Sequence, residues 1–170
     1  INNWKNNLLF YKNIVLLAKK NKDILFLIKS KNYEWLEIPY FYEILDEIKA
    51  STNIEILSDY KDWTSSNCIK NVDFGVVMMS SLGDEILVHD KPIIVFKRED
   101  HKFSSVDYGP IILSHSFDDL LLNIEKIKLD INGYNKSLDL IRKKLFTEYK
   151  PKNFHLLLQE IYNEKNHNIN

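Results

Sequence analysis

The sequence has little of three features that would place a protein in a class at once. It has a single cysteine, Cys68, which excludes an internal disulfide and a cysteine-rich zinc site. No apolar run approaches the roughly 20 residues of a membrane-spanning helix, and there is no signal-peptide pattern. Lysine and arginine number 23 against 24 aspartates and glutamates, a formal net charge of -1. We therefore expect no transmembrane segment and no nucleic-acid partner.

The composition is typical of a globular domain. The chain has 170 residues, 45% of them hydrophobic and 28% charged, which is enough for one domain with a sizeable core. Its first residue is Ile1 rather than methionine, which suggests a domain taken from a longer protein.

Short apolar segments alternate along the chain with segments of helical periodicity. Strands are expected at residues 24–28, 54–57, 74–79, 93–96 and 111–113. Helices are expected near residues 4–21, 39–50, 63–71, 82–90, 117–131, 134–146 and 154–162. This alternation predicts the α/β class, as a Rossmann-like doubly wound parallel sheet with helices on both faces.

The chain divides into three expected parts. Residues 1–130 form the Rossmann-like domain, and Asn132-Gly133 is expected to break the helix that follows the last strand. Residues 131–163 form closing C-terminal helices, whose apolar residues must pack on this domain or on a missing N-terminal one. Residues 164–170 form a polar tail.

Residues 72–96 are the part around which the fold is expected to form. A continuous apolar run is followed by Ser80 and Ser81, then by about ten residues of helical spacing, and then by a second β-branched run. A strand, a helix and a strand in this order form a βαβ unit, whose two strands are parallel. Ligands of such sheets bind at the carboxyl ends of the strands, where Ser80 and Ser81 lie.

Four residues of this unit are candidates for binding an anionic ligand with a sugar. Ser80 and Ser81 offer hydroxyls beside the free N–H groups of the following helix. Glu85 lies one turn further on, and its carboxylate can accept two hydrogen bonds from a diol such as a ribose. Gly83 would let a ligand approach the first turn closely.

The same residues have a purely structural interpretation. Ser81 would then be the N-cap of the helix, and Asp84 would complete a capping box. Both acidic residues of the first turn, Asp84 and Glu85, would interact favourably with the positive end of the helix dipole. Spacing alone favours this interpretation.

The motif nevertheless resembles one shared by GT-B-type enzymes. It comprises Asp73, Ser80-Ser81, Glu85 and Lys91-Pro92 opening the next strand. It is similar to the C-terminal domains of bacterial surface-polysaccharide glycosyltransferases, including capsule Kdo transferases, and of glycerophosphotransferases of teichoic acid synthesis. UDP-N-acetylglucosamine 2-epimerases share a looser version. The resemblance covers residues 24–127.

The resemblance implies the donor-nucleotide-binding half of a two-domain transferase that builds surface polysaccharide. Ser80 and Ser81 would contact the donor phosphate and Glu85 the ribose. The donor would be a CMP- or UDP-sugar or CDP-glycerol, with no further cofactor and no metal. The partners would be a glycan acceptor and an N-terminal Rossmann-like domain, which usually supplies the catalytic base, so this domain alone is expected to be inactive. The location would be the cytoplasm or the inner face of the cell membrane.

This chain also departs from the family pattern. The polysaccharide enzymes often carry Lys-x-His-Pro after the first strand, where this sequence has Lys29, Ser30, Lys31 and Asn32. A phosphate contact from Lys29 and a solvated lysine are equally compatible with this pattern. A non-catalytic α/β interaction module of a cell-envelope synthesis protein remains the alternative function.

The other candidates are weaker. His89 lacks partners at metal-ligand spacing and is interpreted as a surface residue. His115, beside Ser116, is interpreted as a loop residue, and Cys68 as part of the core.

Overall fold

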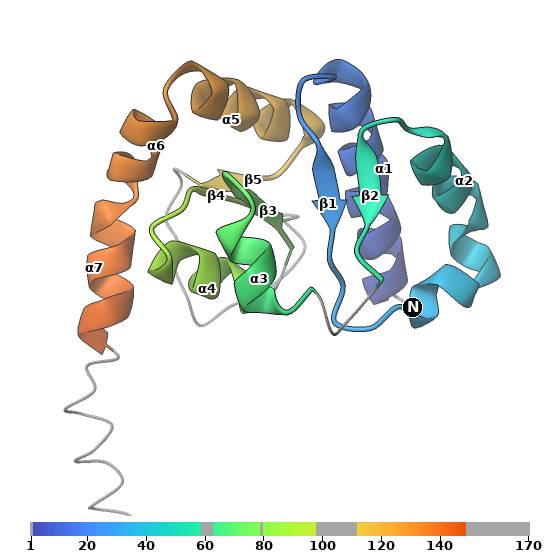
Figure 1. The fold of residues 1–170 in the computed structure, drawn as a ribbon, viewed down its shortest axis with the longest axis horizontal. Helices are drawn as coiled ribbons and strands as arrows, with labels where there is room; N and C mark the ends of the chain where they lie inside the picture. Colours follow the sequence, from blue (N-terminus) through green and yellow to red (C-terminus); the bar gives the residue numbers. More distant parts are fainter. Residues whose placement is uncertain (1, 59–62, 79, 98–111, 149–170) are drawn as a thin grey trace, which may run out of the picture.

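The computed structural model describes residues 2–58, 63–78, 80–97 and 112–148, which form a mixed α/β fold (Figure 1). The elements, in chain order, are α1 (Asn2–Lys20), β1 (Phe26–Ile28), η1 (Glu34–Glu37), η2 (Pro39–Phe41), α2 (Tyr42–Ala50), β2 (Ile54–Ile56), α3 (Ser65–Lys70), β3 (Gly75–Val77), α4 (Leu82–Val88), β4 (Ile93–Phe96), β5 (Leu113–Ser114), α5 (Phe117–Leu129), α6 (Ile131–Ser137) and α7 (Asp139–Glu148). The expected strands are therefore present, most of them shorter than their apolar runs.

All strand pairs among the described residues are parallel. β1 pairs with β2, and β3, β4 and β5 form a second sheet in that order. The parallel pairing of β3 with β4, which the βαβ interpretation of residues 72–96 requires, is confirmed. The expectation of one continuous sheet is wrong for the described part of the chain, where the ladders form two sheets. The architecture is compatible with a Rossmann-like fold but is not clearly doubly wound.

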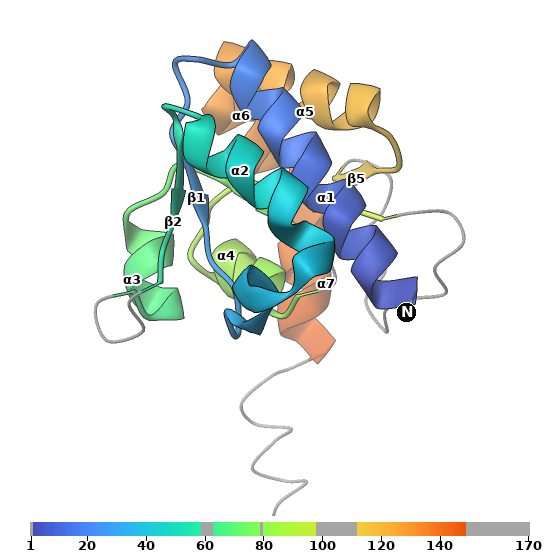
Figure 2. The same cartoon turned by 90° about the vertical axis from the view of Figure 1, so that its right-hand side faces the viewer.

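Side chains join the two sheets where backbone hydrogen bonds do not. Phe26 of β1 and Val77 of β3 belong to the same apolar cluster, together with Leu17 and Ala18 of α1. The opposite face of α1 presents Val15 to a second cluster formed with α2 and η2. Figure 2 shows α1 and α2 side by side. Because α1 contributes to both clusters, it holds the two sheets in one fold.

β4 is the most enclosed strand. All four of its residues are buried, which requires apolar cover on both faces of the sheet. α4 and α5 both pack against β4, and their inward residues Ile86, Leu87, Leu120 and Ile124 lie in the larger cluster. A fully apolar run with no alternation is typical of such a strand.

Gly75 lets α4 approach β3 closely. A Cβ atom at this position would lie 2.5 Å from Cδ1 of Ile86, closer than real carbon contacts. Ile86 is buried, so its side chain has little room to move away. The close packing of helix on strand therefore depends on the missing side chain at residue 75.

Gly75→Ala is expected to lower the free energy of unfolding by about 1–3 kcal/mol, because it overpacks this contact. Ile86→Val removes the clashing Cδ1 atom and should itself cost about 0.5–1.5 kcal/mol. Denaturant unfolding of the double variant should show a smaller loss than the two single losses added together. Strict additivity would mean that the Gly75–Ile86 contact is not the cause.

The C-terminal helices differ from the expectation. Asn132-Gly133 does not break a helix but lies in the first turn of α6, because Asp130 caps that helix by accepting a hydrogen bond from Gly133 N at 2.8 Å. The expected helix 134–146 is divided at Leu138 into α6 and α7. The expected helix 154–162 lies outside the described residues.

α6 and the start of α7 pack back on the domain. Tyr134 and Leu138 are buried in the larger cluster, and Ile141 packs against it. Leu140, on the other side of α7, is 76% exposed. The predicted boundary at residue 130 thus separates two helices that share one core. No helix in the described ranges is long and apolar enough to cross a membrane.

Candidate functional site

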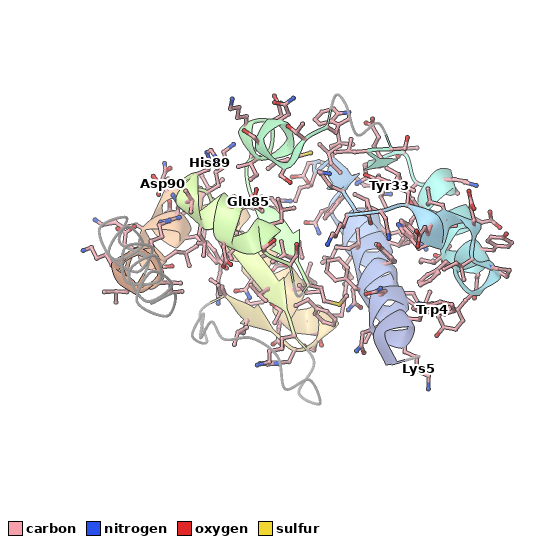
Figure 3. The ribbon with its side chains drawn as sticks, turned by 90° about the horizontal axis from the view of Figure 1, so that it is seen from below. Trp4, Lys5, Tyr33, Glu85, His89 and Asp90 are labelled. Carbon is pink, nitrogen blue, oxygen red and sulfur yellow. The ribbon has the colours of Figure 1, made fainter. Side chains whose placement is uncertain are left out.

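The βαβ unit places the candidate residues at the carboxyl end of β3. Ser80 and Ser81 are exposed in the short connection to α4, and Glu85 is exposed on that helix (Figure 3). Asp84 and Glu85 are the acidic residues of its first turn. The side chains that the resemblance assigns to phosphate and ribose are therefore accessible and lie within six residues of the chain.

The hydroxyl that caps α4 belongs to Ser80. Leu82 N donates to Ser80 Oγ at 3.2 Å. Ser81 has helical torsion angles, φ -59° and ψ -16°, and its side chain makes no cap hydrogen bond. The structural interpretation with Ser81 as capping side chain and Asp84 in a capping box is therefore wrong, because a side chain on already helical backbone points away from the free N–H groups. The Ser81 hydroxyl is not used by the helix cap.

Gly83 has a different environment from its neighbours. It is buried, as are Ile86 and Leu87, whereas Glu85 is exposed. Gly83 thus lies on the inner side of α4, and a ligand at the surface would meet Ser81 and Glu85 first.

Lys29 follows β1, which belongs to the other sheet. Its charge acts on Cys68 of α3: burial raises the pKa of the thiol, and the nearby ammonium of Lys29 partly opposes this rise. The structure therefore places Lys29 near α3. A phosphate contact from Lys29 remains a prediction.

Lys91, the lysine of the Lys-Pro motif, has a structural partner. Its ammonium donates to Lys70 O at 3.1 Å and also to Val72 O. Both carbonyl oxygens lie where α3 ends and the chain turns into β3. Lys91 therefore links the residues that precede β4 to those that precede β3. Pro92, which lies between Lys91 and β4, is buried.

Sequence reasoning missed a contact of His115, which follows β5. Its Nδ1 lies 2.6 Å from the carbonyl oxygen of Lys97, the residue after β4. His115 N and Ser116 N both donate to Asp119 Oδ2, at 2.9 and 3.0 Å. These bonds, those from the backbone of residue 115 foremost, lower the pKa of the Asp119 carboxyl. The only signal in the sequence was a histidine at a strand end.

Ser116 and Asp119 have the Ser-x-x-Asp spacing that favours a capping box, and the structure contains one at the start of α5. Asp119 N donates to Ser116 Oγ at 3.1 Å while the Asp119 carboxylate accepts from Ser116 N. This reciprocal pair fixes the start of α5 and, through it, the backbone of His115.

A hollow of about 480 Å³ lies between β5, α5 and α6. Polar side chains of Asn123, Lys126 and Asp130 line it together with Tyr134. Burial raises the pKa of Tyr134 to about 12, and its hydroxyl donates to Ile93 O at 3.2 Å. None of Ser80, Ser81 and Glu85 lines this hollow.

Nothing in the described residues points to a metal centre. No three side chains of histidine, cysteine, aspartate or glutamate in that part of the chain come together in a group that could hold an ion. His89, at the end of α4, is exposed (Figure 3). The described side chains at the carboxyl end of β3 offer the hydroxyls of Ser80 and Ser81 and the carboxylate of Glu85 for hydrogen bonding.

Comparisons of the chain with protein-family models, with curated proteins and with solved structures found no match.

Proposed function

We propose that this chain is the donor-nucleotide-binding domain of a bacterial surface-polysaccharide glycosyltransferase or a related transferase. The observation that supports this most is the parallel β3–α4–β4 unit with Ser80, Ser81 and Glu85 exposed at its carboxyl end. Ligands of open parallel sheets bind at this end of the strands. The sequence motif at this position is the one that resembles the GT-B-type enzymes.

In this proposal the serine hydroxyls bind phosphate and Glu85 binds the ribose diol. Ser81 has the freer hydroxyl, because Ser80 Oγ already accepts the hydrogen bond of Leu82 N. Ser80 can still donate its own proton to a phosphate oxygen. α4 has only seven residues, so its dipole adds little and the side chains must supply most of the affinity.

The proposed domain is one half of a cleft. A CMP- or UDP-sugar or CDP-glycerol would be held here, while an N-terminal Rossmann-like domain would bring the glycan acceptor and the catalytic base. We place the whole protein in the cytoplasm, at the inner face of the membrane where surface polysaccharide is assembled. The isolated domain would bind nucleotide without turnover.

The domain is expected to bind CMP, CDP or UDP with a dissociation constant on the order of 1 mM, since only half of the cleft is present. Ser81→Ala should weaken binding by about tenfold or more, because a hydrogen bond to a charged phosphate contributes about 1.5–3 kcal/mol. Glu85→Gln should weaken it by a similar factor, because the carboxylate is the charged partner of the ribose hydroxyls. Ligand-observed NMR and calorimetry measure these affinities.

Matched controls separate the site from general effects. Ser66→Ala changes an exposed serine on α3, and Glu43→Gln an exposed glutamate in the first turn of α2. Both should bind nucleotide as the wild type does. The site assignment fails if Ser81→Ala and Glu85→Gln also bind like the wild type, or if several millimolar nucleotide leaves the amides of residues 80–85 unperturbed.

A partner-binding module is the second candidate, and one surface favours it. Trp4 of α1, Tyr40 of η2 and Tyr42 at the start of α2 are 47, 43 and 49% exposed, and the ring centroids of Trp4 and Tyr40 lie 6.1 Å apart. Exposed aromatic side chains close together are typical of protein interfaces. This function would replace the first if no nucleotide binds.

A further inference from the structure

The ends of three adjacent strands meet at the edge of the sheet where the proposed nucleotide site lies. The register aligns Val77 of β3 with Val95 of β4 and with Leu113 of β5. Lys97 and His115 each lie two residues beyond this row, and Ser80 lies three residues beyond it. Since neighbouring strands are about 4.8 Å apart, His115 and Ser80 leave the sheet roughly 10 Å from one another.

The hydrogen bond to Lys97 determines how the ring of His115 can act. A carbonyl oxygen only accepts, so Nδ1 of His115 carries the proton in the 2.6 Å contact with Lys97 O. Nε2 is then the nitrogen left for a ligand, as an acceptor in the neutral ring and as a donor in the cation. His115 is exposed, so a ligand can reach it.

The carboxylate of Asp119 fixes the backbone of residue 115. Asp119 accepts hydrogen bonds from His115 N and Ser116 N, which stabilise its ionised form. Because its oxygen faces the backbone N–H groups, Asp119 orients residue 115 without occupying Nε2.

We propose that Nε2 of His115 contacts the second phosphate of the donor, which makes the donor a nucleoside diphosphate derivative rather than a nucleoside monophosphate sugar. This inference rests on the proposed function: with the first phosphate at Ser80 and Ser81, a second one extends along the strand ends toward His115. When the imidazole ring is cationic, Nε2 can donate a charge-assisted hydrogen bond to a phosphate oxygen. The bond to Lys97 O holds the ring in the required orientation.

Two substitutions separate this contact from the structural role of the residue. In His115→Asn the side-chain amide can take the place of Nδ1 and keep the bond to Lys97 O, but nothing takes the place of Nε2. In His115→Gln the amide reaches the position of Nε2 and loses the bond to Lys97. His89→Asn, at an exposed histidine on the end of α4, is the control.

The experiment measures the affinities of CMP, CDP and UDP by calorimetry, together with the NMR signals of residues 80–85 and of the His115 ring. His115→Asn should weaken CDP and UDP by roughly tenfold or more, the effect of one charge-assisted hydrogen bond, while CMP changes by less than about twofold. The unfolding midpoint of His115→Asn should stay close to that of the wild type, and His89→Asn should bind like the wild type. In the wild type, CDP should shift the His115 ring signals and CMP should not.

Each other outcome overturns the inference in a recognisable way. If residues 80–85 respond to nucleotides but the His115 ring does not respond to CDP, the second-phosphate contact is wrong and the proposed function stands. Equal weakening of CMP and CDP by His115→Asn would also remove the diphosphate assignment. If no nucleotide perturbs residues 80–85, the proposed function falls and the inference falls with it.

Discussion

Asn53→Asp is expected to lower the free energy of unfolding by about 3–5 kcal/mol at pH 7, the range found for an uncompensated buried charge. Asn53 is buried before β2, and its Nδ2 donates to the carbonyl oxygens of Ala18, Asn21 and Ile24 at 3.1, 3.0 and 2.9 Å. An aspartate would direct a negative oxygen at these three acceptors.

The pH dependence of this stability loss shows whether the buried charge causes it. Burial among carbonyl oxygens raises the folded-state pKa of a new carboxyl group above its unfolded value of about 3.9. A carboxyl group with a raised pKa destabilises the fold in its ionised form. The loss in the free energy of unfolding should therefore shrink as the pH falls from 7 towards 4. Protonating the group costs at most about 4 kcal/mol at pH 7, at about 1.36 kcal/mol for each pH unit above 3.9.

Urea unfolding of the wild type and of Asn53→Asp at pH 7, 5.5 and 4 measures this trend. Asn53→Ala should lose about 2–3 kcal/mol at every pH, because three carbonyl oxygens lose their donor without gaining a charge. Asn32→Asp makes the same chemical change at an exposed loop residue and should cost less than about 0.5 kcal/mol. A loss for Asn53→Asp that does not depend on pH would contradict the argument.

Arg142→Met is the second substitution with a large expected effect, about 2–4 kcal/mol, because it removes a charged donor from several buried acceptors. Arg142 lies on α7 and is only 7% exposed. It donates to Leu87 O at 3.1 Å, to Asn135 O at 2.9 Å and to Lys91 O at 3.4 Å. A single guanidinium thus joins α6 and α7 to the end of α4 and the turn before β4.

The carbonyl contacts, rather than the ion pairs, should account for most of this loss. The carboxylates of Asp90 and Asp139 lie 3.2 and 3.0 Å from Nη1 of Arg142, but their side chains are 78 and 52% exposed. Solvent screens such pairs, so Asp139→Asn should cost less than about 1 kcal/mol. Leu87 O belongs to the last turn of α4, where a cation also interacts favourably with the negative end of the helix dipole.

Denaturant unfolding and hydrogen exchange test this arrangement. Met keeps the aliphatic packing of Arg142, and Arg142→Lys should recover only part of the stability, because an ammonium cannot reach all three carbonyl groups. Lys136→Met, at an exposed residue of α6, is the control and should change little. The expectation fails if Asp139→Asn costs as much as Arg142→Met, or if exchange in the turn before β4 is unchanged in Arg142→Met.

The local sequence pattern was sufficient to predict part of this structure. β4 occupies the predicted residues 93–96, because a short uninterrupted β-branched run favours a strand that is buried on both faces. The capping box of Ser116 and Asp119 was equally readable, since all its hydrogen bonds lie within four residues. The parallel pairing of β3 with β4 followed from the helix between them.

The other structural features depend on contacts between segments that are distant in the chain. The division into two sheets, the joining of two apolar clusters by α1, and the burial of Arg142 all depend on residues far apart in the chain. The same holds for the candidate site: the motif located Ser80, Ser81 and Glu85, but their pattern could not say that Ser80 caps α4 or that Gly83 faces inward. It also could not show that His115 meets Lys97 on the neighbouring strand. Hydrophobic periodicity indicates which side of a helix or strand is apolar. The partner of each side chain depends on packing among helices and strands that are remote in sequence.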